Sequence, residues 1–263
     1  MDRKTVKALA KNLRNAELKR KPVGALTATH PNMTVEDAYA VQYAAVETRI
    51  AEGGTLIGKK VGLTSRAMQD FLRVSEPDFG HLFADMLCDE ETPVSVNRFL
   101  QPKVEAEIAF IMGEDLQGPG VTMMDVLRAT AAVVPSFEVV DSRIANWKIK
   151  IQDTIADNGS SAAFLLGSQL VPVDAVNLKH VGLVLEKNGT VIDTAAGAAV
   201  LGHPAQAVAW LANALGRMGV GLKKGEIVLS GSFTKAYEVE AGDLFTATFS
   251  GLGSVKILFA GRK

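Results

Sequence analysis

The sequence predicts a mixed α+β fold in which antiparallel strands dominate. Residues 1–54 carry apolar side chains at helical spacing, whereas short β-like runs recur from residue 55 onward, punctuated by glycine, asparagine and proline. Two helical patches interrupt these runs, so the sequence lacks the strand–helix alternation of a parallel sheet. We therefore expect one domain over residues 1–263, with an N-terminal helical section (1–54) and a β-rich core (55–263).

The helical section contains two predicted helices. In residues 3–20, four apolar side chains recur at helical spacing opposite lysines and arginines: Val6, Leu9, Ala10 and Leu13. The second helix begins at Thr34, and Asp37 stands at the position that completes a capping box. It ends at Gly53 and Gly54, since glycine is common just after a helix C-terminus.

The core contains short predicted strands with two helices between them. The strands are expected over residues 55–64, 103–112, 160–167, 180–192, 226–232 and 244–260. Asn188-Gly189 stands between two strand-like flanks, which predicts a β-hairpin. The helices are expected over residues 122–134 and 203–219, the second with Pro204 in its first turn.

Composition and charge exclude several classes of protein. The chain is 48% hydrophobic, which allows a substantial core, and its net charge of −1 without a dense basic run argues against a nucleic-acid surface. Cys88 is the only cysteine, so intrachain disulfides and cysteine-based zinc clusters are excluded. The N-terminus is too charged for a secretory signal, and no apolar run approaches the ~20 residues of a membrane span. We expect a cytoplasmic protein that contacts no membrane.

Two glutamates stand in the strand-like run "KVEAEIAFIM". Alternate side chains of a strand share a face, so one face is wholly apolar: Val104, Ala106, Ile108 and Phe110. Glu105 and Glu107 share the other face, which becomes apolar again at Ala109 and Ile111. The two charges, ~6–7 Å apart by strand rise, repel each other. They must face solvent, or be protonated, paired or bound to a cation.

A third carboxylate favours the cation. Glu138 lies within the apolar run "AAVVPSFEVV", where burial without a partner is costly. The alternative is a surface strand with Glu138 outward. Three carboxylates without cysteine or clustered histidine form a hard, oxygen-rich ligand set, which favours Mg²⁺ or Mn²⁺ over zinc.

The other polar segments are less specific. Lys59 and Lys60 point to opposite faces of a predicted strand, so one of them can point inward. Asp78 stands in a turn-like context, and the polar run 152–161 is typical of a loop that can hydrogen-bond a ligand. The backbone of "LSGS" (229–232) can approach an anion closely. No nucleophile elbow, P-loop or Rossmann fingerprint is present, which disfavours serine acyl transfer and nucleotide binding.

Several segments, taken in order, resemble a known family: "GKKVGLTS", "EPDFGHLFADM", "QPKVEAEIAF", "FEVVDSRIANWKIKIQDTIADN", "GAAVLGHP" and "VAWLANALG". From about residue 34 to 259 the chain resembles the 2-hydroxypenta-2,4-dienoate (2-oxopent-4-enoate) hydratases of aromatic meta-cleavage pathways. These belong to the fumarylacetoacetate hydrolase superfamily. The resemblance implies a single catalytic domain with a mixed β-roll, a Mg²⁺ or Mn²⁺ ion, a 2-hydroxydienoate or 2-oxo acid substrate, and a homo-oligomer.

The resemblance also assigns roles to residues. It implies three metal ligands: Glu105, Glu107 and Glu138. It places four residues at the substrate: Leu63, Ser161, Gly231 and Ser232. In the implied reaction the dienol is ketonised by protonation at C5, and water then adds at C4 to give 4-hydroxy-2-oxopentanoate. Lys60 would transfer a proton or stabilise enolate charge, and Asp78 would activate the water. Lys59 stands where relatives vary, which implies an outward side chain.

Two relatives with the same fold are alternatives. Asp78 and "NWKIKIQDT" resemble the hydratases, since the 4-oxalocrotonate decarboxylases tend to carry an apolar residue in a "PIYG"-like motif. "GSFTK" (231–235) resembles the branch that hydrates the diacid 2-oxohept-3-enedioate. A C–C bond hydrolase of the same superfamily requires a His–Glu pair that we do not find. A non-catalytic scaffold is the alternative from another class, because hydratase and 4-oxalocrotonate decarboxylase associate in such pathways.

Overall fold

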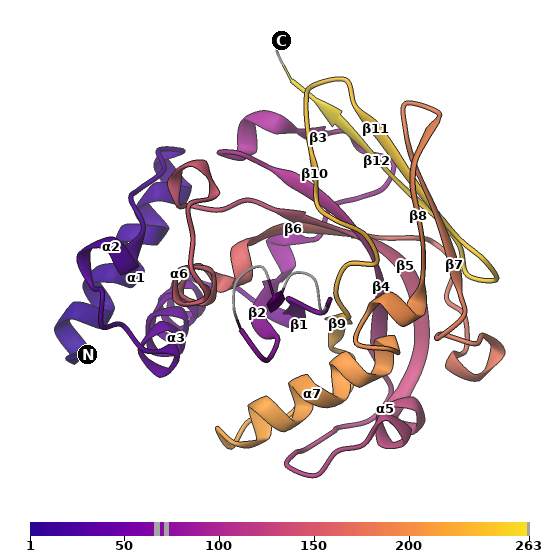
Figure 1. Cartoon of the computed structure of the whole chain (residues 1–263), viewed down its shortest axis with the longest axis horizontal. Helices are drawn as coiled ribbons and strands as arrows, with labels where there is room; N and C mark the ends of the chain where they lie inside the picture. Colours follow the sequence, from indigo (N-terminus) through magenta and orange to yellow (C-terminus); the bar gives the residue numbers. More distant parts are fainter. Residues whose placement is uncertain (66–68, 71–73, 262–263) are drawn as a thin grey trace.

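The chain beyond the N-terminal helices is built around two sheets in the computed structural model, which describes residues 1–65, 69–70 and 74–261 (Figure 1). The first sheet contains β1 (Leu56–Gly62), β2 (Asp78–Phe83), β4 (Lys103–Met112), β5 (Thr130–Val140), β6 (Ser161–Leu166), β9 (Ile227–Leu229) and β10 (Tyr237–Glu238). The second contains β3 (Val94–Ser95), β7 (Gly182–Lys187), β8 (Thr190–Ala196), β11 (Leu244–Phe249) and β12 (Gly253–Ala260).

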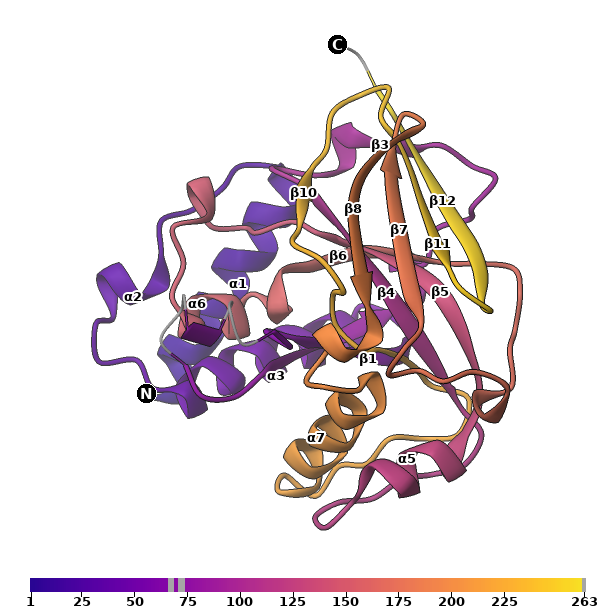
Figure 2. The same cartoon turned by 45° about the vertical axis from the view of Figure 1, so that its right-hand side comes forward.

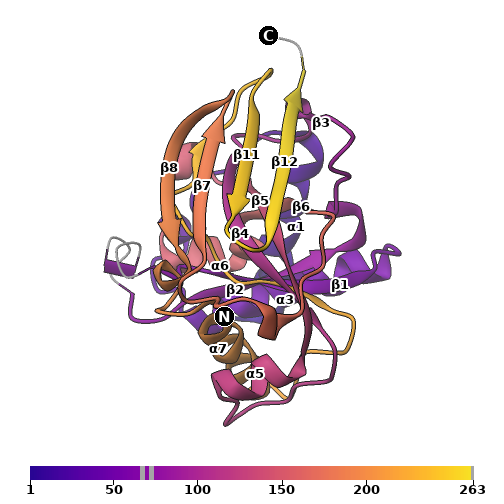
Figure 3. The same ribbon diagram turned by 90° about the vertical axis from the view of Figure 1, so that its right-hand side faces the viewer.

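The strand order of the two sheets confirms the predicted fold class. The first sheet runs β2-β1-β9-β4-β5-β6, with β10 paired to β4, and the second runs β3-β12-β11-β7-β8. Among the described strands, only the β1–β9 and β12–β3 pairs are parallel. Figure 3 shows the long strands of the second sheet side by side. The structure is therefore a curled, mixed and mostly antiparallel β fold.

The alternation of side chains along β4 determines which of its faces packs against the second sheet. The four apolar side chains of one β4 face are buried in a core shared with β11 and β12 of the second sheet: Val104, Ala106, Ile108 and Phe110. The predicted hairpin joins β7 to β8, and Asn188 and Gly189 adopt left-handed φ angles of 53° and 76°. Both positions of such a tight turn require positive φ, which Asn-Gly supplies.

The N-terminal helices gather on one side of the first sheet (Figure 2). They are α1 (Arg3–Lys19), α2 (Leu26–Thr29) and α3 (Val35–Ala51), joined by α6 (Ile151–Ala156). The apolar stripe predicted for α1 is buried, and Thr34 and Asp37 form the predicted capping box of α3. Two further helices, α5 (Met123–Ala129) and α7 (Pro204–Gly216), lie next to each other below the sheets in Figure 1.

Several elements differ from the prediction, including the short α2, β3 and β10, which were not expected. The helix expected over residues 122–134 ends at Ala129, and residues 130–134 belong to β5 because they pair with β4. Strand β2 was not predicted, since it is buried throughout and shows no alternation. Helix α6 was expected to be loop. Its Asp153 accepts hydrogen bonds from the backbone and hydroxyl of Thr27, a partner that local sequence does not reveal.

Within the described ranges, no helix combines the length and the hydrophobicity needed to cross a bilayer.

Candidate metal centre

Strands β4 and β5 bring three glutamates together. Their antiparallel register sets Glu105 directly opposite Glu138, and Glu107 opposite Ser136. Directly paired residues point to the same face of a sheet. One carboxylate oxygen from each of Glu105, Glu107 and Glu138 therefore lies within 4.8 Å of the other two. This face is the one turned away from the second sheet, and it continues into an apolar cluster that includes Ala109.

Burial makes this carboxylate cluster costly when it is charged. Glu107 and Glu138 are fully buried, and Glu105 is half-buried. Burial and the neighbouring Glu138 raise the pKa of Glu105 to about 7. Burial, Glu138 and Glu105 raise the pKa of Glu107 well above its usual range. Each group resists ionisation next to the others, so a bound cation would relieve both burial and repulsion.

Lys60 comes to the same face from β1. The register places Lys60 opposite Leu229 of β9, and Leu229 opposite Ala109 of β4, so the three side chains share one face. The ammonium Nζ lies 3.4 Å from Glu138 Oε2 and donates to the carbonyl oxygen of Gly159 at 3.1 Å. Burial alone would lower the pKa of Lys60, but Glu138 and the other acids of the site raise it, so the amine stays protonated.

Asp78 stands beside Lys60 and not in a turn. It is the first residue of β2, is buried, and lies opposite Gly62 of β1. A Cβ atom added to Gly62 would stand 2.1 Å from Asp78 Oδ1 and 3.1 Å from Lys60 Nζ, so the missing side chain leaves room for both groups. Burial raises the pKa of Asp78 against the opposing effect of Lys60.

Two of the four predicted substrate residues, Ser161 and Gly231, lie at these carboxylates. Ser161, the first residue of β6, is buried beside Glu138. Burial raises the pKa of Glu138, and Lys60 and the Ser161 hydroxyl oppose this rise. The Gly231 amide donates to Glu107 Oε2 at 2.7 Å, from a φ of 106° that favours glycine. Leu63 lies next to Thr64, which packs against Gly231. Ser232 follows Gly231, and its hydroxyl has no hydrogen-bond partner among the described residues.

The prediction missed polar residues around the site. Ser136 is fully buried opposite Glu107, and its hydroxyl has no hydrogen-bond partner in the part of the chain that the structure describes. Strand alternation could have found it, because it stands two positions before Glu138. The Arg143–Asp157 ion pair was also missed. It joins two segments that no local pattern connects.

Lys59 does not project into solvent as expected. It points to the face opposite Lys60, as alternation predicts, but it is 2% exposed and binds both carboxylate oxygens of Glu226 at 2.6 and 2.7 Å. His81 of β2 stands directly opposite Lys59 and is also buried. Burial and the charge of Lys59 lower the pKa of His81 to about 4.

His81 should make stability dependent on pH. Its pKa is lower in the folded chain than the usual 6.5, so only the unfolded chain takes up this proton between pH 6.5 and about 4. Stability from neutral His81 is therefore complete above pH 6.5 and falls by up to about 3 kcal/mol as pH drops to 4. Urea unfolding at several pH values measures this. His81→Gln should flatten this part of the profile, and an unchanged slope would contradict the assignment.

The donor set fits a hard divalent cation. Carboxylate oxygens are the ligands that Mg²⁺ and Mn²⁺ prefer, and the three glutamates supply them from two rigid strands. Glu107 Oε1 and Asp78 Oδ1 have no hydrogen-bond partner among the residues described here. Lys60 supplies one positive charge against four carboxyl groups, those of the three glutamates and Asp78. The site can therefore accept positive charge without displacing an internal hydrogen bond.

Comparison with known proteins identifies relatives over nearly the whole chain. Residues 48–258 match the family described as fumarylacetoacetate (FAA) hydrolase C-terminal. The chain is 49% identical over 222 residues to the 2-hydroxypent-2,4-dienoate hydratase of Pseudomonas putida, covering 84% of this chain and 100% of that protein. It is 45% identical over 260 residues to the 2-hydroxyhexa-2,4-dienoate hydratase of Comamonas testosteroni, covering 98% of each.

A solved structure has almost the same fold. The 4-oxalocrotonate decarboxylase from Pseudomonas putida G7, complexed with magnesium and adipate, matches with a TM-score of 0.96. The two chains are 39% identical, and the match covers 98% of each.

Proposed function

Because the chain belongs to the fumarylacetoacetate hydrolase family, we propose that it is a divalent-metal-dependent hydratase acting on 2-hydroxypenta-2,4-dienoate. It adds water to give 4-hydroxy-2-oxopentanoate, a hydro-lyase step of aromatic meta-cleavage catabolism. One observation carries this proposal: three carboxylates, two of them fully buried, converge within 4.8 Å, with a buried lysine 3.4 Å from one of them. A non-catalytic scaffold has no need for such a cluster.

The proposed metal ligands are Glu105, Glu107 and Glu138, and the proposed ion is Mg²⁺ or Mn²⁺. When bound, the ion supplies Lewis-acid chemistry, drawing charge from the 2-oxo acid end of the substrate. The magnesium in the related decarboxylase structure supports this choice. The Gly231 amide keeps Glu107 oriented by its 2.7 Å hydrogen bond, so this ligand is held by the backbone.

Lys60 is proposed to move the proton and hold negative charge that develops on the substrate. Its ammonium is fixed on two sides, by Glu138 and by the carbonyl oxygen of Gly159. A buried, protonated and oriented amine suits both tasks. The proposed substrate-contacting set is Leu63, Ser161, Gly231 and Ser232. The buried hydroxyls of Ser161 and Ser232, which have no hydrogen-bond partner among the described residues, are the proposed donors.

Asp78 is proposed to activate the water. Asp78→Asn keeps the size of the side chain but removes its basicity, so kcat for hydration should fall about 100-fold while Mn²⁺ affinity stays within a few-fold. Ultraviolet assay of dienoate loss and calorimetric Mn²⁺ titration measure the two quantities. Full activity of the Asn variant would reduce Asp78 to a structural residue.

Parallel assays distinguish the hydratase from its two alternatives. The chain should consume 2-hydroxypenta-2,4-dienoate and form 4-hydroxy-2-oxopentanoate, and it should release no carbon dioxide from 4-oxalocrotonate. Release of carbon dioxide without hydration would make it a decarboxylase, whose fold is nearly identical. Faster hydration of the seven-carbon diacid would assign it to 2-oxohept-3-enedioate. The substituent at C5 is tested in the same series, since the two hydratase relatives differ there.

The cellular setting completes the proposal. The chain acts in the cytoplasm as a homo-oligomer and as one catalytic domain, and it associates with a 4-oxalocrotonate decarboxylase that passes on its product. Size-exclusion chromatography of the chain alone, and of a mixture with that decarboxylase, tests both associations.

A further inference from the structure

The turn before β6 has an unusual backbone. Three consecutive residues, Asn158, Gly159 and Ser160, have left-handed φ angles of 59°, 59° and 56°. This conformation is unfavourable for residues other than glycine, so surrounding contacts must hold it. The segment 157–161, called the 157–161 turn below, contributes the Gly159 carbonyl oxygen that accepts from Lys60 and ends at Ser161 beside Glu138.

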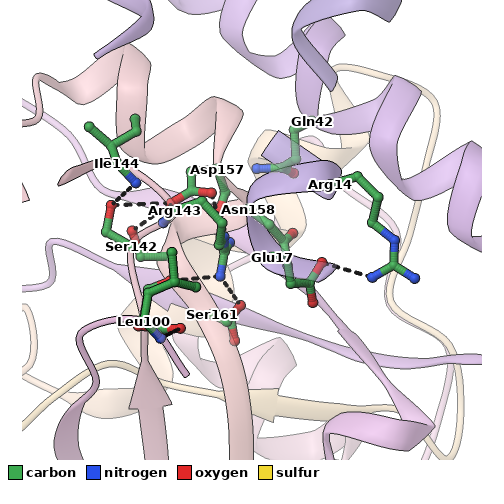
Figure 4. Close-up of polar contacts among 12 residues, drawn as sticks. Arg14, Glu17, Gln42, Leu100, Ser142, Arg143, Ile144, Asp157, Asn158 and Ser161 are labelled. Carbon is green, nitrogen blue, oxygen red and sulfur yellow. Dashed lines mark hydrogen bonds and ion pairs between the residues drawn. The ribbon is translucent and has the colours of Figure 1, made fainter. Parts of the chain in front are cut away.

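Arg143 braces both ends of the 157–161 turn (Figure 4). Its Nε donates to Asp157 Oδ1 at 2.5 Å, and its Nη2 donates to the carbonyl oxygen of Asp157. Its Nη1 donates to the carbonyl oxygen of Ser161 at 3.0 Å. The backbone amide of Arg143 also donates to Asp157 Oδ2 at 2.9 Å. One side chain therefore fixes the first and the last residue of the turn.

The middle of the turn is fixed to β2. Asn158 Oδ1 accepts from the His81 amide at 2.8 Å, and Asn158 Nδ2 donates to the His81 carbonyl oxygen at 2.9 Å. Gly80, next to His81, gives the turn its room, because an added Cβ would stand 2.4 Å from the Asn158 carbonyl oxygen. Arg143 holds both ends of the turn, and these bonds hold its middle. The Gly159 carbonyl oxygen therefore points toward Lys60.

We propose that Arg143 is a positioning residue for Lys60. It touches neither the three glutamates of the site nor Lys60. It acts by holding the 157–161 turn, whose Gly159 carbonyl fixes the ammonium next to Glu138. Arg143 lies just after the end of β5, the strand that supplies Glu138. The role of Lys60 in turnover rests on the proposed function, whereas the positioning is a property of the fold.

Only a guanidinium fits this task. Its planar fork donates from three nitrogens in fixed directions, and here it reaches both ends of the turn at once. An ammonium keeps the charge but is a single point of donation, so a lysine side chain at this position can pair with Asp157 without reaching Ser161. Arg143→Lys therefore isolates positioning from charge.

A double-mutant cycle tests the proposal. Arg143→Lys, Lys60→Met, the double variant and the parent chain are titrated with pyruvate at saturating Mn²⁺ by calorimetry, and their kcat for the dienoate is measured. Arg143→Lys should weaken pyruvate binding or lower kcat about 10-fold in the parent, but less than 2-fold in the Lys60→Met background. Mn²⁺ affinity should not change by more than about 3-fold, since none of its proposed ligands contacts Arg143.

Arg49 supplies the matched control. It makes a two-oxygen ion pair with Asp85 at 2.7 and 2.8 Å. Among the described residues its hydrogen bonds go to Asp85 and Met86 and not to the 157–161 turn, although Arg49 and the turn line the same pocket. Arg49→Lys should change pyruvate affinity and kcat by less than 2-fold. Amide hydrogen exchange gives a readout that needs no ligand: residues 158–161 should exchange faster in Arg143→Lys and not in Arg49→Lys.

The outcomes separate this inference from the proposed function. Equal losses in the parent and Lys60→Met backgrounds would overturn positioning even if the chain is a hydratase. Coupled losses of pyruvate affinity would support it even if the chain hydrates nothing. If Arg143→Lys does not fold, Asp157→Asn takes its place in the cycle. Failure of both variants to fold would also overturn the proposal, because the pair would then serve folding alone.

Discussion

Glu107→Gln should lower hydration by at least about 1000-fold and Mn²⁺ affinity by at least about 100-fold, because it removes a charged ligand from a buried site. The amide is the same size, and its oxygen can still accept from the Gly231 amide. Without metal, this variant should also unfold at a higher temperature than the parent. The reason is that a neutral amide removes both the cost of burying a charge and the repulsion from Glu138 and Glu105, which together raise the pKa of Glu107.

The opposite signs of these two effects distinguish a metal ligand from a structural residue. Glu226→Gln is the matched control, because Glu226 pairs with Lys59 on the other face of the sheet. It should lower stability and leave Mn²⁺ affinity unchanged. Calorimetric titration and thermal unfolding of both variants measure the difference. Loss of stability with retained turnover in Glu107→Gln would make the metal assignment wrong.

Lys60→Met should lower kcat about 1000-fold, within the range for loss of a proton-transfer group. The variant removes the ammonium 3.4 Å from Glu138, so Mn²⁺ affinity should stay equal or rise, since a competing cation is gone. Steady-state hydration kinetics with saturating Mn²⁺ give kcat, and calorimetry gives the affinity.

The neighbouring lysine is a close control for this variant. Lys59→Met changes the same residue type on the same strand, but its side chain lies on the opposite face in an ion pair with Glu226. It should unfold at a lower temperature, because Glu226 loses its partner, and it should keep kcat within about 3-fold. Equal kcat losses in the two variants would indicate that Lys60 acts through folding and not through chemistry.

Local periodicity predicted the strand that carries the site but not the site itself. Alternation alone placed Glu105 and Glu107 on one face and an apolar set on the other, and the structure has this arrangement. The pairing of Glu105 with Glu138 is a register between two strands, which residue spacing cannot give. The family resemblance identified Glu138, Lys60 and Asp78 as site residues. Strand alternation and the cost of burial had left several alternatives open for each of them.

The errors have the same physical origin. Alternation correctly set Lys59 and Lys60 on opposite faces, but the burial of Lys59 depends on Glu226, which is 167 positions away. Asp78 has turn-like neighbours in the sequence, yet pairing with β1 makes it the start of a buried strand. Arg143 and Asp157 lie in segments without a periodic signal, so their ion pair could be found only in the folded chain.

Metal dependence of hydration tests the central claim most directly. The chain is stripped with a chelator, its metal content is checked by elemental analysis, and the ultraviolet loss of 2-hydroxypenta-2,4-dienoate is followed before and after addition of Mg²⁺ or Mn²⁺. The cluster of Glu105, Glu107 and Glu138 predicts no measurable hydration by the stripped chain and recovery with either ion. Undiminished hydration by the metal-free chain would contradict the account.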